Sequence, residues 1–399
     1  MKIGLFTDTY YPEINGVANA VYELKKGLEE RGHTVYVFTV ENPKVTEDEN
    51  NVFRLTSIPL PLLKDRRLCV SFLRKWKWMI RRLNLDVIHT HTEFILGHLG
   101  RVSAEKLGIV HIHTYHTQYE DYTHYLKIPE EHSRLAKAVV RKFSRRCCNL
   151  AQGIIVPTKK TEQLLKTYGV SSPISIQPSG MDVAKFWNTN PEIIKRLQCQ
   201  YGIDPDSRVF LFVGRLAREK NIGEILRLLA PVLKEYPESR FMIIGEGPEK
   251  EKLQKMITEL GIEQSVIMTG GVPFAEIENY YALGDIFVCA SNSETQGLTY
   301  IEAMASGLCL LVKQDECLSG VLKPGVNGFT YIDEKDFFSK MSELLHMDEL
   351  SRRRITENAI ITARQYETGY YARKIDEVYQ RFLAEKKNKK ARYRKIGLR

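Results

Sequence analysis

The stretch from Phe210 to Asn221 carries three cations, and the spacing of two of them, Arg215 and Lys220, suits a bound diphosphate. A buried strand is predicted to end at Gly214, and Arg215 and Lys220 follow before a helix begins. A diphosphate leaving group needs compact positive charge and backbone N–H groups, and a loop between a strand and a helix supplies both. The alternative is that the two cations only solvate the loop, and these residues alone do not decide between the two interpretations.

A later loop adds two carboxylates. Glu294 follows the predicted strand Ile286–Cys289, and Glu302 lies about one turn inside the helix that Gly307 closes. Carboxylates so placed can accept hydrogen bonds from hydroxyl groups, Glu302 from the pair on a ribose and Glu294 from a sugar further out. Because glutamates on loops and helices are usually only solvated, this interpretation depends on the cationic loop upstream.

Five histidines lie near predicted strand ends in the first half of the chain: His89, His91, His111, His113 and His116. The spacing H-x-H occurs twice and suits zinc, because residues two apart on a strand share a face. No cysteine or carboxylate completes an evident site. Asp204-Pro205-Asp206 resembles a D-x-D metal motif, yet it precedes a strand and is interpreted as a turn. The sequence therefore predicts no metal site.

Short β-branched strands alternate with helices along the chain, which predicts how these residues are positioned. The first series of predicted strands is Ile3–Thr7, Thr34–Val40, Val87–His91, Val110–Tyr115 and Gly153–Pro157, and the second is Val209–Val213, Arg240–Ile244, Val266–Thr269, Ile286–Cys289 and Leu308–Val312. Helices are expected between them, for example over Val17–Arg31, Ile222–Tyr236 and Leu298–Ser306. Each series is typical of a doubly wound parallel sheet, so the sequence predicts an α/β fold with two such domains.

The length of 399 residues also favours two domains over one core. We expect residues 1–180 to form the first domain and residues 181–370 the second, with a linker near Ile176–Gly180. Residues 371–399 should form a C-terminal helix that crosses back to the first domain, followed by a basic tail. Ligands of such sheets bind beyond the carboxyl ends of the strands, so we expect the chemistry in a cleft where the two domains face each other.

Composition indicates a folded protein that meets an anionic partner. Residues 1–180 hold 26 lysines and arginines against 18 acids, a net charge of +8, whereas residues 181–384 hold 24 against 30, a net charge of −6. Residues 385–399 hold 8 against 1, which adds +7. No segment resembles a membrane span or a signal peptide, and the seven cysteines form no disulfide framework, so we expect a reducing, cytoplasmic setting.

The E-x7-E spacing of Glu294 and Glu302, together with Gly214-Arg215 and Lys220, resembles the retaining glycosyltransferases of family four, which have the GT-B fold. The resemblance covers nearly the whole chain and implies two Rossmann-like domains, the second of which binds a nucleotide sugar. It implies that Arg215 and Lys220 hold the donor diphosphate. Glu294 would contact the transferred sugar and Glu302 the ribose. The implied donor site is completed by Gly16, Gly214, Gly297, Leu298 and Thr299.

The loop Tyr11–Val17 resembles the glycine-containing loop of that family between donor and acceptor, with Asn15 in place of one of its two glycines. Asparagine tolerates a positive φ, so we expect the turn to survive. The resemblance also implies that His116 faces the sugar and positions it by a hydrogen bond, while acid–base chemistry stays open.

The implied mechanism is electrostatic and needs no metal or other cofactor. Negative charge that develops on the departing diphosphate would be stabilised by Arg215, Lys220 and a helix N-terminus. No residue is an obvious covalent nucleophile. Retention of the anomeric configuration therefore implies attack on the face that the leaving group occupies.

Two basic segments of the first domain interleave cations with apolar residues. Residues 64–82 carry eight cations and one acid, and residues 133–150 carry six cations and no acid. Basic amphipathic helices with tryptophan suit an anionic bilayer, to which each cation contributes about 1 kcal/mol. The candidate membrane and acceptor residues are Lys64, Arg66, Arg67, Arg74, Lys75, Trp76, Trp78, Arg81, Arg141 and Arg145. The alternatives are a solvated helix face over a core stripe, or nucleic acid, for which no recognised motif is present.

Longer stretches resemble the 1,2-diacylglycerol 3-glucosyltransferases of Gram-positive-type bacteria, namely residues 89–101, 113–125, 293–302 and 315–318. This resemblance implies glucose transfer from UDP-glucose to diacylglycerol by a peripheral protein on the inner face of the membrane. One alternative is another lipid acceptor, such as phosphatidylinositol with GDP-mannose, or an existing glycolipid. A non-enzymatic alternative is a polybasic membrane or RNA adaptor, which would not need the two cations and two glutamates of the donor site.

Overall fold

The computed structural model divides into two compact units, which we call unit 1 (Met1–Met181 with Thr368–Arg399) and unit 2 (Asp182–Glu367). It describes all residues except 14, 46, 48, 61–62, 72, 119–129, 205–206, 292 and 396–399, and it leaves out the side chains of residues 63–66, 73–74, 130–134 and 389–395. Within the described part of the chain, no helix combines the length and apolarity needed to cross a lipid bilayer.

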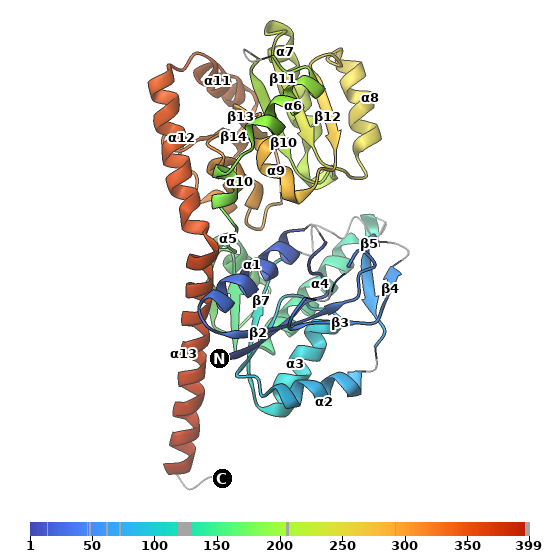
Figure 1. Cartoon of the computed structure of the whole chain (residues 1–399), viewed down its shortest axis with the longest axis vertical. Helices are drawn as coiled ribbons and strands as arrows, with labels where there is room; N and C mark the ends of the chain where they lie inside the picture. Colours follow the sequence, from blue (N-terminus) through green and yellow to red (C-terminus); the bar gives the residue numbers. More distant parts are fainter. Residues whose placement is uncertain are drawn as a thin grey trace. The chain divides into compact units, whose positions relative to one another are not determined.

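Unit 1 is built on a parallel sheet of seven strands in the order β3-β2-β1-β6-β7-β8-β9 (Figure 1). The strands are β1 (Lys2–Phe6), β2 (Thr34–Val40), β3 (Val52–Leu55), β6 (Val87–Thr90), β7 (Val110–Thr114), β8 (Gly153–Val156) and β9 (Ile174–Ile176). The central strands β6, β7 and β8 are buried along their whole length, as expected for a parallel sheet covered on both faces.

Helices cover both faces of this sheet: α1 (Gly16–Glu30), α2 (Leu73–Leu83), α3 (Ile95–Leu107), α4 (Glu130–Asn149), α5 (Lys159–Thr167) and α13 (Thr368–Lys395). Leu5 packs with α1 and α13, whereas the next residue, Phe6, packs with α2 and α3. Neighbouring residues of a strand point to opposite faces, so each strand serves two cores. The C-terminal helix α13 belongs to unit 1.

The first half of the basic segment 64–82 is not helical, so our expectation of one amphipathic helix there was wrong. Residues Leu63–Cys69 form β5, which pairs antiparallel with β4 (Ser57–Leu60), and the helix α2 begins only at Leu73. Cys69 is buried between the exposed Leu68 and Val70. That alternation has the period of a strand, and it was obscured by the density of cations.

Unit 2 contains a parallel sheet of six strands in the order β12-β11-β10-β13-β14-β15. The strands are β10 (Val209–Val213), β11 (Arg240–Ile244), β12 (Val266–Gly270), β13 (Ile286–Cys289), β14 (Cys309–Lys313) and β15 (Phe329–Tyr331). The helices are α6 (Pro191–Tyr201), α7 (Ile222–Glu235), α8 (Lys250–Leu260), α9 (Ile277–Tyr281), α10 (Leu298–Ala305), α11 (Glu334–Leu345) and α12 (Glu349–Ala363). The expectation of two doubly wound parallel sheets is confirmed.

Candidate functional site

The loop after β10 is anchored by buried apolar residues, and its first cation, Arg215, is exposed. Gly214 has φ 155°, a conformation that favours glycine. Arg215 is exposed, whereas Leu216 and Ala217 are buried. The backbone N–H of Leu216 donates to the carbonyl of Glu246 at 3.0 Å. The loop is therefore anchored by buried residues, while Arg215 itself is exposed.

Two glycines after β11 bring that loop against the one after β10. A Cβ atom on Gly245 would lie 1.9 Å from the carbonyl oxygen of Gly214, and one on Gly247 would lie 2.3 Å from that of Leu216. Only glycine allows the two backbones to approach so closely. Our sequence reasoning missed these positions, although the G-x-G spacing directly after a buried strand was a signal for them.

Lys220 and Glu294, from loops that are far apart in sequence, form an ion pair. Lys220 ends the short 3-10 helix η3 (Arg218–Lys220), and its Nζ donates to Glu294 Oε1 at 2.5 Å. The two side chains are only 22% and 10% exposed. Partial burial strengthens the attraction between the charges, and removal of one partner would leave the other uncompensated. The pair therefore joins the loop after β10 to the loop before α10.

The helix α10 begins at the residues predicted for donor binding. Gly297 has φ 74°, and a Cβ atom there would lie 2.5 Å from the ring of the buried Tyr300. Leu298 and Thr299 follow as the first residues of the helix. The N–H groups of a first helical turn lack partners within the helix and carry its positive dipole end, so this turn can bind an anion or hydroxyl oxygens.

Glu302 lies one turn further into α10 and is held by a tyrosine. The hydroxyl group of Tyr281, at the end of α9, donates to Glu302 Oε2 at 2.7 Å. Burial raises the pKa of Glu302. A carboxylate has about four lone-pair directions, so Glu302 can accept further hydrogen bonds from a ligand. Tyr281 carried no sequence motif and was missed.

In unit 1, the predicted glycine loop leads into α1, whose first residue is Gly16. Asn15 does not use the positive φ that asparagine tolerates: its φ is −159° and its backbone is extended. Asn15 instead caps the helix: its Oδ1 accepts from the N–H of Ala18 at 3.0 Å, and its Nδ2 donates to Thr9 at 2.7 Å. Asparagine is among the best N-cap residues, and the cap requires this extended backbone.

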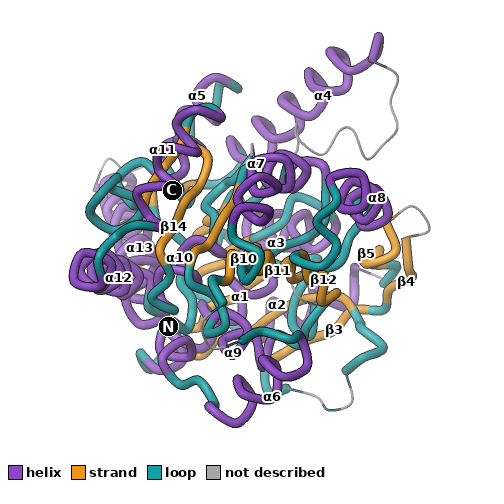
Figure 2. The backbone as a smooth tube through the Cα atoms, turned by 90° about the horizontal axis from the view of Figure 1, so that it is seen from above, coloured by secondary structure: helices purple, strands orange, loops and turns teal. Residues whose placement is uncertain are grey.

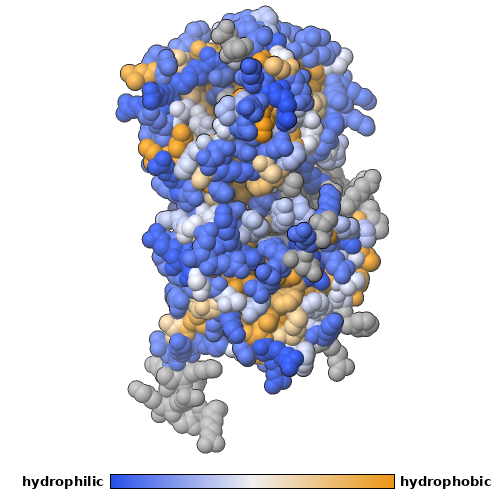
Figure 3. Space-filling model, in the orientation of Figure 1, coloured by the Kyte–Doolittle hydropathy of each residue, from blue (hydrophilic) through white to orange (hydrophobic). Residues whose placement is uncertain are grey.

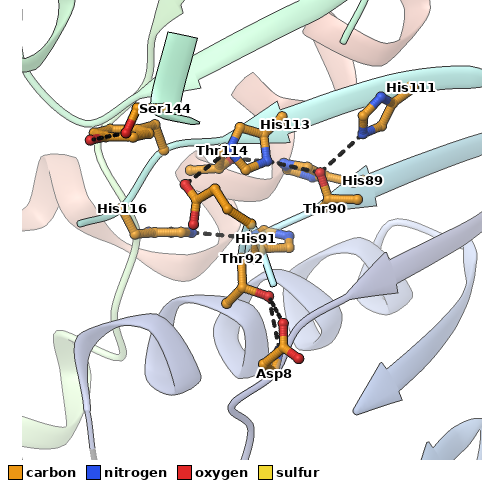
Figure 4. A network of polar contacts seen from close by, with 12 residues as sticks. Asp8, His89, Thr90, His91, Thr92, His111, His113, Thr114, His116 and Ser144 are labelled. Atoms are coloured by element: carbon orange, nitrogen blue, oxygen red, sulfur yellow. Dashed lines mark hydrogen bonds and ion pairs between the residues drawn. The ribbon is translucent and has the colours of Figure 1, made fainter. Parts of the chain in front are cut away.

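The five histidines are divided between the two faces of the unit 1 sheet (Figure 4). His89, His91 and His116 lie on the α13 side, where His89 contacts Tyr379. His111 and His113 lie on the opposite face, and both contact Thr90. Among the described residues, no group of three or more histidine, cysteine or carboxylate side chains is arranged to hold a metal ion. In the D-x-D stretch, Pro205 and Asp206 lie outside the described residues.

His116 is paired with another neutral imidazole. Its Nε2 lies 3.0 Å from Nδ1 of His91. Burial lowers the pKa of His116 to about 3 and keeps the pKa of His91 well below its usual value. Both rings are therefore uncharged near neutral pH, so His116 can give or accept a hydrogen bond but is a weak base.

The histidines of the other face form a chain that ends at a carboxylate. Thr90 Oγ1 lies 3.0 Å from His111 Nε2 and 2.8 Å from His113 Nδ1. His113 Nε2 lies 3.2 Å from Glu93 Oε1. An ionised carboxylate only accepts hydrogen bonds, so the nitrogen that faces it is the protonated one.

The helix α2 divides its tryptophans between core and surface. Trp76 packs against Phe53, with ring centroids 6.4 Å apart, and Ile80 is fully buried beside them. Trp78 is 59% exposed and lies under the guanidinium group of Arg82 at 4.2 Å. Lys75 and Arg81 are exposed as well. Figure 3 shows hydrophobic residues, in orange, among hydrophilic ones on the visible face of unit 1.

The remaining basic candidates have different environments. Arg67 holds the hairpin, because its guanidinium group donates to the hydroxyl and carbonyl of Ser57 at 2.9 and 2.8 Å. Arg141 and Arg145 are exposed on α4, whose N-terminal part extends outward in Figure 2. The side chains of Lys64, Arg66 and Arg74 lie outside the described residues.

Comparison with known proteins identifies the family. Residues 14–185 match the model of Glycosyltransferase Family 4, and residues 194–361 match that of Glycosyl transferases group 1. The chain is 35% identical to the alpha-monoglucosyldiacylglycerol synthase of Acholeplasma laidlawii over 98% of this chain and 99% of that protein. It is 37% identical to the enzyme of the same name from Streptococcus pneumoniae, over 86% of this chain and 78% of that one.

The fold has a solved counterpart in HepE from Anabaena, determined in complex with UDP. That structure superposes with a TM-score of 0.73 at 18% identity and covers 95% of this chain and 100% of HepE. At that identity the match concerns the fold alone. The two family models, however, match residues 14–185 and 194–361, and the two synthases align over 98% and 86% of this chain. The protein therefore belongs to the family-4 glycosyltransferases of GT-B fold, the family of the alpha-monoglucosyldiacylglycerol synthases.

Proposed function

We propose that this glycosyltransferase transfers glucose from UDP-glucose to diacylglycerol, retains the anomeric configuration and requires no metal. The names of the two synthases support the sugar and the acceptor. The Lys220–Glu294 pair carries the proposal for the chemistry, because it unites a cation and a carboxylate beside the start of α10. Arg215 stands on the same loop as Lys220.

In the proposed mechanism, cationic side chains replace a metal at the leaving group. Arg215 and Lys220 bind the diphosphate, and the backbone N–H groups of Leu298 and Thr299 provide further donors. As the anomeric bond breaks, negative charge grows on the phosphate oxygens and these groups stabilise it. Glu294 keeps the ammonium group of Lys220 oriented and accepts a hydrogen bond from the transferred sugar. The acceptor hydroxyl attacks from the side on which the diphosphate departs, and its proton passes to a phosphate oxygen of that leaving group.

Glu302 is proposed to bind the ribose and His116 to position the sugar. The contact with Tyr281 fixes the Glu302 carboxylate, which can then accept from both ribose hydroxyls. The pKa of His116, lowered to about 3, suits a hydrogen-bonding role better than proton abstraction. Gly16 lies at the first turn of α1, where its exposed backbone can approach a ligand.

The protein is proposed to work on the inner face of the cell membrane through the exposed sides of α2 and α4. Trp78, Lys75 and Arg81 of α2 and Arg141 and Arg145 of α4 form two cationic surfaces. Such surfaces attract anionic lipid headgroups by about 1 kcal/mol per cation. All seven cysteines are free, which suits a reducing compartment.

The decisive experiment offers the purified protein a panel of labelled sugar nucleotides with vesicles of several lipids. We expect label from UDP-glucose in a lipid product only when diacylglycerol is present, with an α-linkage by NMR and unchanged rates in EDTA. Transfer from GDP-mannose to phosphatidylinositol, or to an existing glycolipid, would contradict the proposed donor and acceptor. Inhibition by EDTA that is reversed by a divalent cation would contradict metal independence.

A further inference from the structure

Unit 1 contains a pocket of about 330 Å³ between α3 and α4, which we call the α3–α4 pocket. Thr90, Glu93 and His113 form its floor at the carboxyl end of β6, the edge where α/β sheets bind ligands. Its α4 wall consists of Phe143, Arg146, Cys147 and Leu150. The volume lies at the lower end of the range of about 300–1,000 Å³ for small-molecule sites. A pocket of this volume can hold a glycerol unit together with the first carbons of the chains attached to it.

The floor of the pocket offers a fixed hydrogen-bond acceptor. The side chains of Glu93 and His113 are 1% and 3% exposed, and His113 Nε2 lies 3.2 Å from Glu93 Oε1. Thr90 holds the other nitrogen of His113 at 2.8 Å, so the ring cannot turn freely. A carboxylate accepts up to about four hydrogen bonds, so Glu93 can also accept one from a ligand hydroxyl.

The exposed side of α4 leads into the same pocket. Leu135, Val139 and Phe143 are 67%, 60% and 41% exposed. They are spaced by four residues and therefore lie on one face of the helix. The stripe continues through Cys147, which lines the pocket as Phe143 does. An apolar stripe thus runs along α4 to the pocket that Glu93 also lines.

Two arginines add donors to the pocket lining. Arg101 comes from α3, where its guanidinium group lies 2.7 Å from His98 Nδ1, and Arg146 comes from α4. Guanidinium groups donate hydrogen bonds and accept none, so they suit carbonyl oxygens. The pocket therefore combines one deep acceptor, cationic donors and an apolar stripe.

We propose that the α3–α4 pocket binds the glycerol end of diacylglycerol, with the acyl chains along the stripe of α4. Diacylglycerol has one hydroxyl donor, which suits Glu93, and two ester carbonyls, which suit Arg101 and Arg146. The two guanidinium groups would attract a phosphate as well, but only a hydroxyl group can donate to the buried Glu93 carboxylate, whereas a phosphate at that depth would be repelled by it; the deep acceptor therefore favours a neutral glycerol head. The proposal rests on the proposed function and assigns its acceptor to particular residues.

The first test replaces the deep acceptor with a neutral side chain of the same shape. In mixed micelles, Glu93→Gln should raise the KM for dioleoylglycerol at least tenfold. The KM for UDP-glucose and the binding to vesicles should stay within twofold of wild type. The glutamine oxygen can still accept from His113, so the fold should persist, and the melting temperature checks this. An unchanged KM for dioleoylglycerol in a folded variant would overturn the proposal.

The second test uses two neighbouring exposed arginines of α4, of which only Arg146 lines the pocket. Arg146→Ala and Arg145→Ala remove the same charge from the same helix and should weaken binding to anionic vesicles alike. Only Arg146→Ala should raise the KM for dioleoylglycerol in neutral micelles, by about fivefold. Equal KM values in the two variants would show that both arginines act only as surface charges, and this result would overturn the proposal. Neither substitution disturbs a buried side chain.

A direct measurement locates the lipid on the wild-type protein. A dioleoylglycerol analogue with a photoreactive diazirine in one acyl chain should label peptides from residues 135–150, and unlabelled dioleoylglycerol should compete. Labels confined to other parts of unit 1, or competition by phosphatidylglycerol alone, would overturn the assignment. If wild-type protein transferred no sugar to diacylglycerol, the proposed function would fail. An active wild type with unchanged variants would refute the pocket alone.

Discussion

The loops of unit 2 that carry Lys220 and Glu294 and the histidine network of unit 1 place their polar groups in different ways. In unit 2 the key side chains follow strands: Lys220 comes after β10, and Glu294 lies between β13 and α10. In unit 1 three of the five histidines lie within the strands, where His89, His111 and His113 are buried and bonded to neighbours on the sheet. Loop residues can change partners when a ligand arrives. Strand residues with fixed partners keep their hydrogen bonds and mainly stabilise the position of neighbouring side chains.

The largest effect that tests this difference should come from the ion pair of unit 2. We expect Lys220→Ala and Glu294→Ala each to lower kcat/KM for transfer about a thousandfold or more, because each removes charge complementarity at the leaving group. Binding to vesicles, which we assign to unit 1, should not change. Radiolabelled transfer and vesicle flotation measure the two properties separately.

The matched control removes an exposed ion pair from the same unit. Lys340 and Glu343 of α11 lie 3.3 Å apart, and Lys340→Ala should leave transfer within twofold of wild type, because such surface pairs contribute 0–1 kcal/mol. Full turnover by Lys220→Ala or Glu294→Ala would contradict the roles that we assign to these two residues.

The second prediction is that mild acid destabilises unit 1 before unit 2. Burial lowers the pKa values of His111 and His116 to about 3, below their value of 6.5 in an unfolded chain. Between pH 7 and 5 these histidines therefore bind protons in the unfolded state but stay neutral in the folded state. Each of them lowers the free energy of unfolding by about 2 kcal/mol over this range. Asp8 acts in the opposite direction, because its pKa is raised to about 6 in the folded protein. It takes up a proton in the folded state over the same pH range, which offsets about 1 kcal/mol of the destabilisation by the histidines.

Hydrogen exchange followed by mass spectrometry, corrected for intrinsic rates, can compare the two units in one experiment. Peptides from β6 and β7 should lose protection between pH 7 and 5, while peptides from β10 and β13 keep theirs. Residues 182–367 contain a single histidine, His346, so unit 2 is the internal control. Simultaneous loss of protection from exchange in both sheets would show that the histidine network does not determine the stability of unit 1 in acid.

The same difference explains how much the sequence could predict. Glycine, cations and acids that follow apolar runs predict a site at the ends of parallel strands, and Lys220 and Glu294 do lie in such loops. Their contact depends on strand order, because β10 and β13 are neighbours in the sheet although two strands separate them in sequence. No pairwise pattern in the sequence encodes that order.

Unit 1 was harder to interpret because its functional candidates depend on tertiary neighbours. Glu93 carries no motif beyond its place after a strand, and its burial follows from the packing of α3 and α4 around it. Likewise, Trp76 and Trp78 look equivalent in sequence, yet only Trp76 meets Phe53. The hairpin of β4 and β5 was missed because its cations mask a period of two residues.

The third prediction concerns Glu302 and a smaller loss. Glu302→Gln should raise the KM for UDP-glucose about tenfold with little change in kcat, because a ribose contact binds substrate and transition state alike. Burial raises the pKa of Glu302, so in the wild type protonation removes an acceptor as the pH falls. The KM of the wild type should therefore rise toward acid pH and that of the variant should not. Parallel pH profiles would contradict the ribose role.

The smallest effect should come from the exposed tryptophan of α2. Trp78→Ala should weaken binding to anionic vesicles about fivefold, because its ring is already partly covered by Arg82 and further burial in a bilayer contributes about 1 kcal/mol. Trp76→Ala, the matched substitution two residues earlier, should lower the melting temperature instead, since Trp76 packs into the core. Flotation at rising salt should separate the cations of α2, whose attraction is screened, from the tryptophan, whose contribution persists. If the two tryptophan variants behaved alike in both measurements, α2 would be a core helix with a solvated face, and membrane contact would depend on α4.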